Sequence, residues 1–122
     1  MGKENKIIGN DGEDAAAGYL RSKGWKILDR NFRSQQGEID IIAKDKDVLV
    51  FVEVKNYSCR NYYPPALAIT KDKKRCIIHA ARLFIHRRNI KDINCRFDVV
   101  TILRDGDGGS KFEHYKAAFG IN

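Results

Sequence analysis

The sequence predicts an α/β domain in which helices pack against a mixed β-sheet, and three observations lead to this fold class. Val48 to Lys55 is rich in β-branched residues, as buried strands are. Two segments, Asp11 to Lys23 and Thr70 to about Arg88, carry apolar residues at helical spacing. The second of these helices separates three strand-like segments from two others, which implies a long connection across the sheet. We expect all 122 residues to form one domain.

The N-terminal half is predicted to form a helix and three strands. Residues 1–10 are polar and are expected to be a loose lead-in, with Asp11 as the N-cap of the first helix. Gly24 is the natural C-terminal stop of that helix. A polar turn at Lys44 to Asp47 joins the last two of the three strands, which are expected at Trp25 to Arg33, Glu38 to Lys44 and Val48 to Lys55.

The C-terminal half begins with a predicted loop, Asn56 to Pro65, which lacks a periodic apolar pattern. Thr70 can cap a second helix, whose apolar stripe comprises Ile77, Ala80, Ala81, Phe84 and Ile85. A turn at Asp105 to Gly109 is expected to join two final strands, at Arg96 to Leu103 and around Phe112 to Tyr115.

The chain is basic, with a formal net charge of +7 and a pI near 9.4. Such a charge favours polyanionic partners, because neutralising phosphates releases condensed counterions. Charge alone does not separate nucleic acid from an anionic membrane surface. No long basic amphipathic helix with exposed aromatic residues stands out, so nucleic acid is the expected partner and a membrane is not. Without a signal peptide or a run of about 18 apolar residues, we expect a soluble, cytoplasmic protein.

The three cysteines are irregularly spaced, which argues against a disulfide framework or a structural zinc site. They are expected to be small apolar residues in a reducing compartment. No ligand spacing relates the cysteines to the histidines; the residues concerned are Cys59, Cys76, Cys95, His79, His86 and His114.

Strand parity brings three charged residues together. In Val48 to Lys55 the four valines point one way, and the opposite face carries Leu49, Phe51, Glu53 and Lys55. In the preceding strand one face carries Ile39, Ile41 and Ala43, and the other carries Glu38, Asp40 and Ile42. If the two strands pair through their turn, the isoleucines at 39 and 41 join the valine face. Asp40 then falls on the same face as Glu53 and Lys55.

Two carboxylates beside a lysine form an electrostatically awkward cluster, because like charges and burial both raise a carboxyl pKa. A divalent cation removes the conflict, and Mg²⁺ often uses one or two carboxylates with water and phosphate. The ion would polarise a phosphodiester and lower the pKa of a bound water, while Lys55 would orient that water or stabilise charge on the phosphate. A plainer alternative stays open: Glu53 and Lys55 can be an ordinary pair at a strand end, and Asp40 can meet a neighbouring arginine.

Glu13 can complete this cluster. It lies near the start of the first helix, three, four and seven residues before Ala16, Ala17 and Leu20 on the neighbouring inward face. A glutamate on such a face can reach the sheet. The alternative is an acidic residue that is favourable at a helix N-terminus.

These residues resemble the PD-(D/E)XK nuclease superfamily, and specifically the small bacterial YraN family. The most specific part is Gly37-Glu38-Ile39-Asp40, twelve intervening residues, and then Glu53-Val54-Lys55. The resemblance covers nearly the whole chain and also includes Gly9, Gly12-Glu13, Ala16, Tyr19-Leu20, Gly24, Asn31-x-Arg33, Phe51-Val52, Lys73, Arg96-Phe97-Asp98-Val99-Val100 and Ala118-Phe119.

The resemblance implies a restriction-endonuclease-like core, close to archaeal Holliday-junction resolvases. It implies that Asp40 and Glu53 are metal ligands, Lys55 the catalytic lysine and Glu13 an accessory acidic residue that joins the metal site. Ile39 stands where the superfamily name has proline. Relatives commonly have an arginine two residues after the lysine; here Tyr57 holds that place and Arg60 is the nearest arginine. The candidate nucleic-acid contacts are Arg33, Arg60, Lys73 and Lys74.

Three hypotheses follow for the function. The leading one is an endonuclease that uses Mg²⁺ or Mn²⁺ to hydrolyse phosphodiesters in nucleic acid, with DNA and branched structures as the expected substrates. The second is a non-catalytic nucleic-acid-binding module on the same scaffold. The third is an interaction protein whose basic second helix docks an acidic partner. A homodimer would suit two-stranded or branched DNA.

Overall fold

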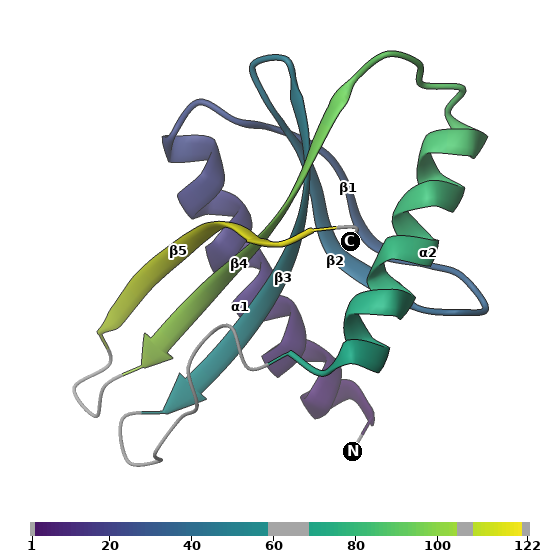
Figure 1. The fold of residues 1–122 in the computed structure, drawn as a ribbon. Coiled ribbons are helices and arrows are strands. Elements are labelled where there is room, and N and C mark those ends of the chain that lie inside the picture. The colour runs from purple at the N-terminus through teal and green to yellow at the C-terminus, as the bar shows by residue number, and fades with distance from the viewer. Residues whose placement is uncertain (1, 59–68, 105–108, 121–122) are drawn as a thin grey trace.

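A computed structural model describes residues 2–58, 69–104 and 109–120, with the backbone alone for residues 2–11 and 57–58. A five-stranded sheet lies between two helices, one on each face (Figure 1). The elements in chain order are α1 (Gly2–Ser22), β1 (Lys26–Arg33), β2 (Glu38–Asp45), β3 (Val48–Ser58), α2 (Lys71–Arg87), β4 (Asn94–Arg104) and β5 (Ser110–Phe119).

The strands lie in the sheet in the order of the chain, β1-β2-β3-β4-β5. The β3–β4 pair, which α2 connects, is parallel, and the other three pairs are antiparallel. A mixed sheet with a helix on each face confirms the predicted α/β class, and it is the arrangement of a restriction-endonuclease-like core.

The alternation of side chains in β3 divides the core into two layers. The α1 layer packs small residues of the helix against the valine face and comprises Ala16, Ala17, Leu20, Trp25, Ile41, Ala43, Val50, Val52, Val100 and Ile102. The α2 layer is richer in phenylalanine and comprises Ile39, Ile42, Leu49, Phe51, Ile77, Ala80, Ala81, Phe84 and Phe97. Both layers are buried, so β3 and β4 lie at the centre of the domain.

Two predicted helix ends are confirmed. Thr70 caps α2, and its hydroxyl accepts a hydrogen bond of 3.1 Å from the backbone N–H of Lys73. Gly24 follows the end of α1 with a φ of 88°, a left-handed conformation that glycine adopts without steric cost.

Two element boundaries differ from the predictions. Helix α1 begins at Gly2, so residues 2–10 are helical rather than a loose lead-in, and Asp11 is not its N-cap. The apolar pattern marks the turns that pack on the sheet and does not report how far a helix continues beyond them. Strand β3 continues to Ser58, into the predicted loop, because its parallel pairing with β4 runs on to the Ser58–Arg104 pair.

A buried ionic network joins β4 to β5. The Asp98 carboxylate is fully buried and accepts hydrogen bonds from the guanidinium of Arg96 at 2.9 and 3.0 Å. The His114 Nε2 atom lies 2.8 Å from the same carboxylate, and the N–H of Ala117 donates to it at 2.9 Å. Burial alone would raise the pKa of Asp98, but the hydrogen bonds from His114 and Arg96 outweigh it and lower the pKa.

Neither helix in the described part of the chain is long and apolar enough to cross a membrane.

Candidate active site

The candidate site lies where strands β2 and β3 separate. Their antiparallel pairing runs from Asp45↔Val48 to Ile41↔Val52, whereas β1 continues to pair with β2 as far as Glu38. Just beyond the last β2–β3 pair, Oδ2 of Asp40 accepts a hydrogen bond of 2.8 Å from the backbone N–H of Val54. The Asp40 side chain therefore satisfies a backbone donor of β3 that the neighbouring strand has left unpaired.

The prediction that Ile39 joins the valine face was wrong. Ile41 does pack in the α1 layer, but Ile39 packs in the α2 layer beside Ile42 and Phe51. Strict alternation holds only for a regularly paired strand, and the side-chain direction shifts by one residue where β2 leaves β3. Asp40 lies at this shift. Its carboxyl group interacts with that of Glu53.

Asp40 and Glu53 form a carboxyl pair in which the proton affinity of Glu53 is raised. Only 10% of the Glu53 side chain is exposed, and its carboxyl group shares a hydrogen bond with that of Asp40. Burial first, and then the negative charge of Asp40, raise the pKa of Glu53 to about 7. Near neutral pH the Glu53 carboxyl group therefore readily holds a proton, which a cation of higher charge can replace.

Two lysines flank this pair. The Nζ atom of Lys73, in the first turn of α2, lies 3.5 Å from Oε2 of Glu53, and the charges of Lys73 and then Lys55 oppose the rise in the Glu53 pKa. Within residues 12–56, 69–104 and 109–120, Lys55 makes no hydrogen bond or ion pair. Its ammonium group is therefore free of competing partners in those segments.

Sequence reasoning placed Lys73 among the nucleic-acid contacts and missed its pairing with Glu53. The capping position of Thr70 was the available signal, because it fixes Lys73 as the third residue of the helix. What the sequence does not give is the direction in which that first turn faces.

Glu13 brings a third acidic group to the α1 side of the site. Burial first, and then the charge of Asp40, raise the pKa of Glu13, while a hydrogen bond with Asn31 and the charge of Arg30 oppose the rise. One carboxyl oxygen, Oε1, is buried and has no hydrogen-bond partner among the residues that the structure describes, and Nη2 of Arg30 lies 3.9 Å away. The predicted contribution of Glu13 to the acidic cluster thus has an electrostatic basis in its interaction with Asp40.

The donor set fits a hard divalent cation held by two carboxylates. Asp40 and Glu53 supply the oxygen ligands that Mg²⁺ prefers, and magnesium sites commonly complete their coordination with water and phosphate. In the described segments, no three His, Cys, Asp or Glu side chains form a group that could hold a metal ion. Direct ligation by Glu13 therefore stays a prediction.

The other predicted nucleic-acid contacts lie apart from the carboxyl pair. Arg33 is exposed at the end of β1 and lies 3.3 Å from the carboxylate of Glu38. Lys74 lies over the ring of Phe119, with its Nζ atom 5.9 Å from the ring centroid. Arg60 falls outside the described residues, as does the side chain of Tyr57.

The model of the uncharacterised protein family UPF0102 matches residues 12–102, which include the carboxyl pair and both lysines. The chain belongs to UPF0102. This is the YraN family that the motifs indicate. A UPF0102 protein of Geobacter sulfurreducens is 45% identical over 115 residues, 94% of this chain and 90% of that protein.

Two further UPF0102 proteins show the same near-complete coverage. The protein of Syntrophotalea carbinolica is 43% identical over 94% of this chain and 93% of its own length. The protein of Persephonella marina is 41% identical over 95% of this chain and 96% of its own length. The UPF0102 match therefore spans the sheet and both helices.

Proposed function

We propose that this protein is a metal-dependent endonuclease that uses Mg²⁺ or Mn²⁺ to hydrolyse phosphodiester bonds in nucleic acid. The observation that carries the proposal is the Asp40–Glu53 carboxyl pair at the separation of β2 and β3, with the lysine charges of Lys55 and Lys73 beside it. Buried like charges are costly unless the site binds something positive. DNA, including branched forms, is the proposed substrate.

The carboxyl pair and the two lysines each have a defined role in this proposal. Asp40 and Glu53 would hold the ion, and the Val54 N–H fixes the orientation of Asp40 through its other oxygen. When bound, Mg²⁺ would polarise the phosphodiester and lower the pKa of a coordinated water. Lys55, whose positive charge acts on Glu53, would bind a phosphate oxygen and stabilise the charge that develops there. Lys73 offsets the charge of Glu53.

A polyanionic substrate fits the charge of the chain. The net charge of +7 gives a field that attracts phosphates, and Arg33, Lys73 and Lys74 place cations on β1 and the first turn of α2. A two-fold dimer would present two such sites to two strands and is part of the proposal for branched DNA.

One observation favours a second candidate function, a nucleic-acid-binding module without hydrolysis. In the described residues the carboxyl pair lacks a third protein ligand, and Lys73 already compensates part of the Glu53 charge. A site balanced in this way can be stable without a metal ion. Such a module would bind nucleic acid in a salt-dependent manner and would not nick it.

A substrate panel separates the two candidates. Labelled single-stranded, duplex, flap and four-way-junction DNA, and single-stranded RNA, are incubated with the protein in Mg²⁺, Mn²⁺ or EDTA. The proposal predicts cleavage of at least one substrate with either ion, none in EDTA, and none by Glu53→Gln. Asp47→Asn is the matched control, because Asp47 is exposed in the turn at the opposite end of the β2–β3 hairpin. Binding without cleavage in any ion would instead support the module.

A further inference from the structure

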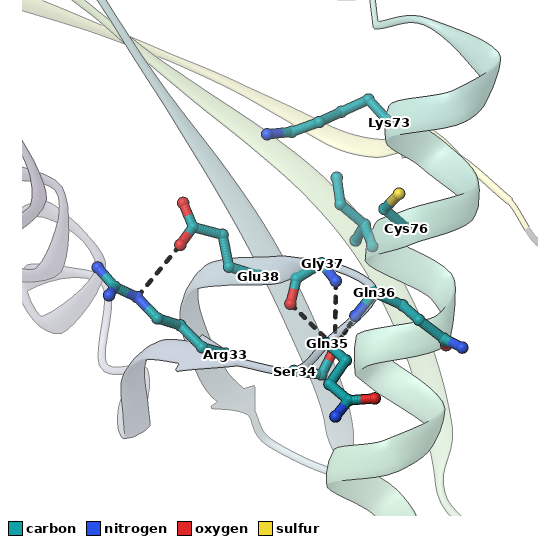
Figure 2. Close-up of a pocket in the computed structure, with 9 residues that line it drawn as sticks. Arg33, Ser34, Gln35, Gln36, Gly37, Glu38, Lys73 and Cys76 are labelled. Atoms are coloured by element: carbon teal, nitrogen blue, oxygen red, sulfur yellow. Dashed lines mark hydrogen bonds and ion pairs between the residues drawn. The ribbon is translucent and has the colours of Figure 1, made fainter.

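A pocket of about 420 Å³ lies between the β1–β2 turn and α2. We call it the turn–helix pocket; its lining residues are Arg33, Ser34, Gln35, Gln36, Gly37, Glu38, Lys73, Cys76 and Ile77. In Figure 2, Lys73 and Cys76 lie on the helix α2, and residues 33–38 lie on the turn and its flanking strands. Ile77, the remaining lining residue, also belongs to α2. The volume is in the range of about 300–1,000 Å³ that is typical of small-ligand sites.

The turn–helix pocket adjoins the carboxyl pair. Lys73 lines the pocket and also lies 3.5 Å from Glu53, so one side chain belongs to both. Glu38 lines the pocket as well, and it precedes Asp40 by two residues in β2. A polymer bound at Asp40 and Glu53 would therefore have an adjacent unit within reach of the pocket.

The wall made by the turn is held firmly in place. The Ser34 hydroxyl accepts hydrogen bonds from the N–H groups of Gln36 and Gly37 at 3.2 and 3.1 Å, and it donates to the Gly37 carbonyl at 3.0 Å. Gly37 also lies against α2 so closely that a Cβ atom there would be 2.6 Å from the Cys76 carbonyl oxygen. The pocket is therefore preformed, which lowers the entropic cost of binding.

The lining combines three kinds of recognition. Cys76 and Ile77 offer an apolar wall on the helix side. The side-chain amides of Gln35 and Gln36 are exposed and make no hydrogen bond within the described segments, so they can each donate and accept. Arg33 supplies a positive charge, and its ion pair with Glu38 is exposed and hence easily exchanged. A flat apolar ring with a hydrogen-bonding edge and an attached anion matches all three.

We propose that the turn–helix pocket binds one unpaired nucleotide of the strand whose phosphodiester lies at Asp40 and Glu53. The base lies against Cys76 and Ile77, its edge faces Gln35 and Gln36, and its phosphate contacts Arg33 or Lys73. A base edge that meets the two glutamines cannot at the same time pair with a complementary strand. The inference rests on the proposed function and narrows its substrate to nucleic acid with an unpaired nucleotide beside the cleaved bond.

Nuclear magnetic resonance titration in EDTA tests the pocket without any cleavage. The probes are thymidine 5′-monophosphate, ribose 5-phosphate and inorganic phosphate, added to the ¹⁵N-labelled protein. We expect thymidine 5′-monophosphate to shift the side-chain amide signals of Gln35 and Gln36 and the backbone signal of Gly37, and the other two probes to leave the glutamines unshifted. Unshifted glutamine signals with the nucleotide, or equal shifts with ribose 5-phosphate, would overturn the proposal.

A second measurement uses the double variant Gln35→Ala/Gln36→Ala and compares its affinities for a fully paired duplex and for the same duplex with a single-stranded flap. In EDTA we expect flap binding to weaken about tenfold, the effect of one or two lost hydrogen bonds, with duplex binding unchanged. Asn94→Ala, an exposed amide at the start of β4, is the control. Equal flap affinity in the wild type and the double variant would contradict base recognition by the pocket.

The two proposals fail in different ways. If the nucleotide does not shift the signals of the pocket residues but the protein still cleaves DNA with Mg²⁺, the nucleotide site is refuted and the nuclease proposal stands. If the nucleotide shifts these signals but no substrate is cleaved, the nuclease proposal is refuted and a nucleotide-binding site remains.

Discussion

The ammonium nitrogen of Lys73 lies 3.5 Å from Oε2 of Glu53, so α2 contributes a charge to a carboxyl pair that β2 and β3 build. This contact joins three elements at one point. It also connects the carboxyl pair to the turn–helix pocket, which Lys73 lines. The charge of Lys73 is therefore expected to affect both the protonation of the pair and the binding of a substrate phosphate.

Removing this charge should raise the pKa of Glu53 further. In Lys73→Met a positive charge near Glu53 is lost. Because 45% of the Lys73 side chain is exposed and water screens its charge, the Glu53 pKa should rise by less than about one pH unit. Titration of ¹³C-labelled carboxyl signals in EDTA measures it. Lys74→Met, one position along the same helix, should leave the Glu53 pKa unchanged. A Glu53 pKa that falls in Lys73→Met would contradict the electrostatic account.

The raised pKa of Glu53 predicts that the metal-free protein loses stability as the pH rises. The folded protein keeps the Glu53 proton up to about pH 7, whereas the unfolded chain releases it near the ordinary value of 4.5. The folded state thus binds more protons between these values, and the free energy of unfolding decreases across that window. Glu53→Gln should remove the decrease and be more stable than the wild type at pH 8, by on the order of 3 kcal/mol.

Urea unfolding at pH 5 and pH 8 in EDTA checks this prediction, with Asp47→Asn as the control. A wild-type stability that rises from pH 5 to pH 8 by as much as that of Glu53→Gln would show that the Glu53 proton is not retained.

The Asp98 network predicts a large loss of stability in Asp98→Asn. The substitution leaves Arg96 and His114 without their buried carboxylate, and breaking such a network commonly costs about 3–5 kcal/mol. The register of β4 and β5 changes at this point, so β5 should lose protection from hydrogen exchange first. Chemical unfolding and hydrogen exchange measure the two effects. Asp92→Asn, an exposed position before β4, should change neither.

Two glycine-to-alanine substitutions should change the stability of the protein in opposite directions. A Cβ atom at Gly37 would lie 2.6 to 2.9 Å from atoms of Cys76, two of them backbone, so Gly37→Ala must displace α2 and should destabilise the protein by about 1–3 kcal/mol. At Gly18, an exposed position in α1, a Cβ atom meets nothing within 4 Å, and Gly18→Ala should stabilise the protein by about 0.5–1 kcal/mol. Thermal unfolding compares them. A stabilised Gly37→Ala would contradict the close approach of the turn to α2.

The order of the elements and the two-layer core follow from local patterns, and the sequence predicts them well. From Val48 to Val54, valines alternate with other largely apolar residues, and this pattern predicts burial on both faces of β3. Thr70 marks a helix start because its hydroxyl can accept a backbone hydrogen bond, and Gly24 marks a helix end because glycine adopts a positive φ. Such signals depend on neighbouring residues. They do not report how far an element continues beyond its buried part, which is why the start of α1 and the end of β3 were misplaced.

The sequence identifies the residues of the candidate site better than it predicts their arrangement in space. Asp40 and Glu53 do meet, but strand parity predicts side-chain direction only where β2 and β3 stay paired. They separate beyond the Ile41–Val52 pair, which reverses the placement of Ile39. Contacts between distant segments carry no local signal. The pairing of Lys73 with Glu53 depends on how α2 is set against the sheet, and the burial of Asp98 depends on β5 folding back onto β4.

The rate of cleavage as a function of Mg²⁺ concentration tests the central claim most directly. Single-turnover rates are measured on the best substrate of the panel for the wild type, Glu53→Gln and Lys55→Met, with Lys26→Met as a control at the far end of the sheet. The account predicts a wild-type rate that rises with Mg²⁺ and saturates, a loss of at least about 100-fold in both site variants, and an unchanged rate in Lys26→Met. A Glu53→Gln rate equal to that of the wild type at every Mg²⁺ concentration would contradict it.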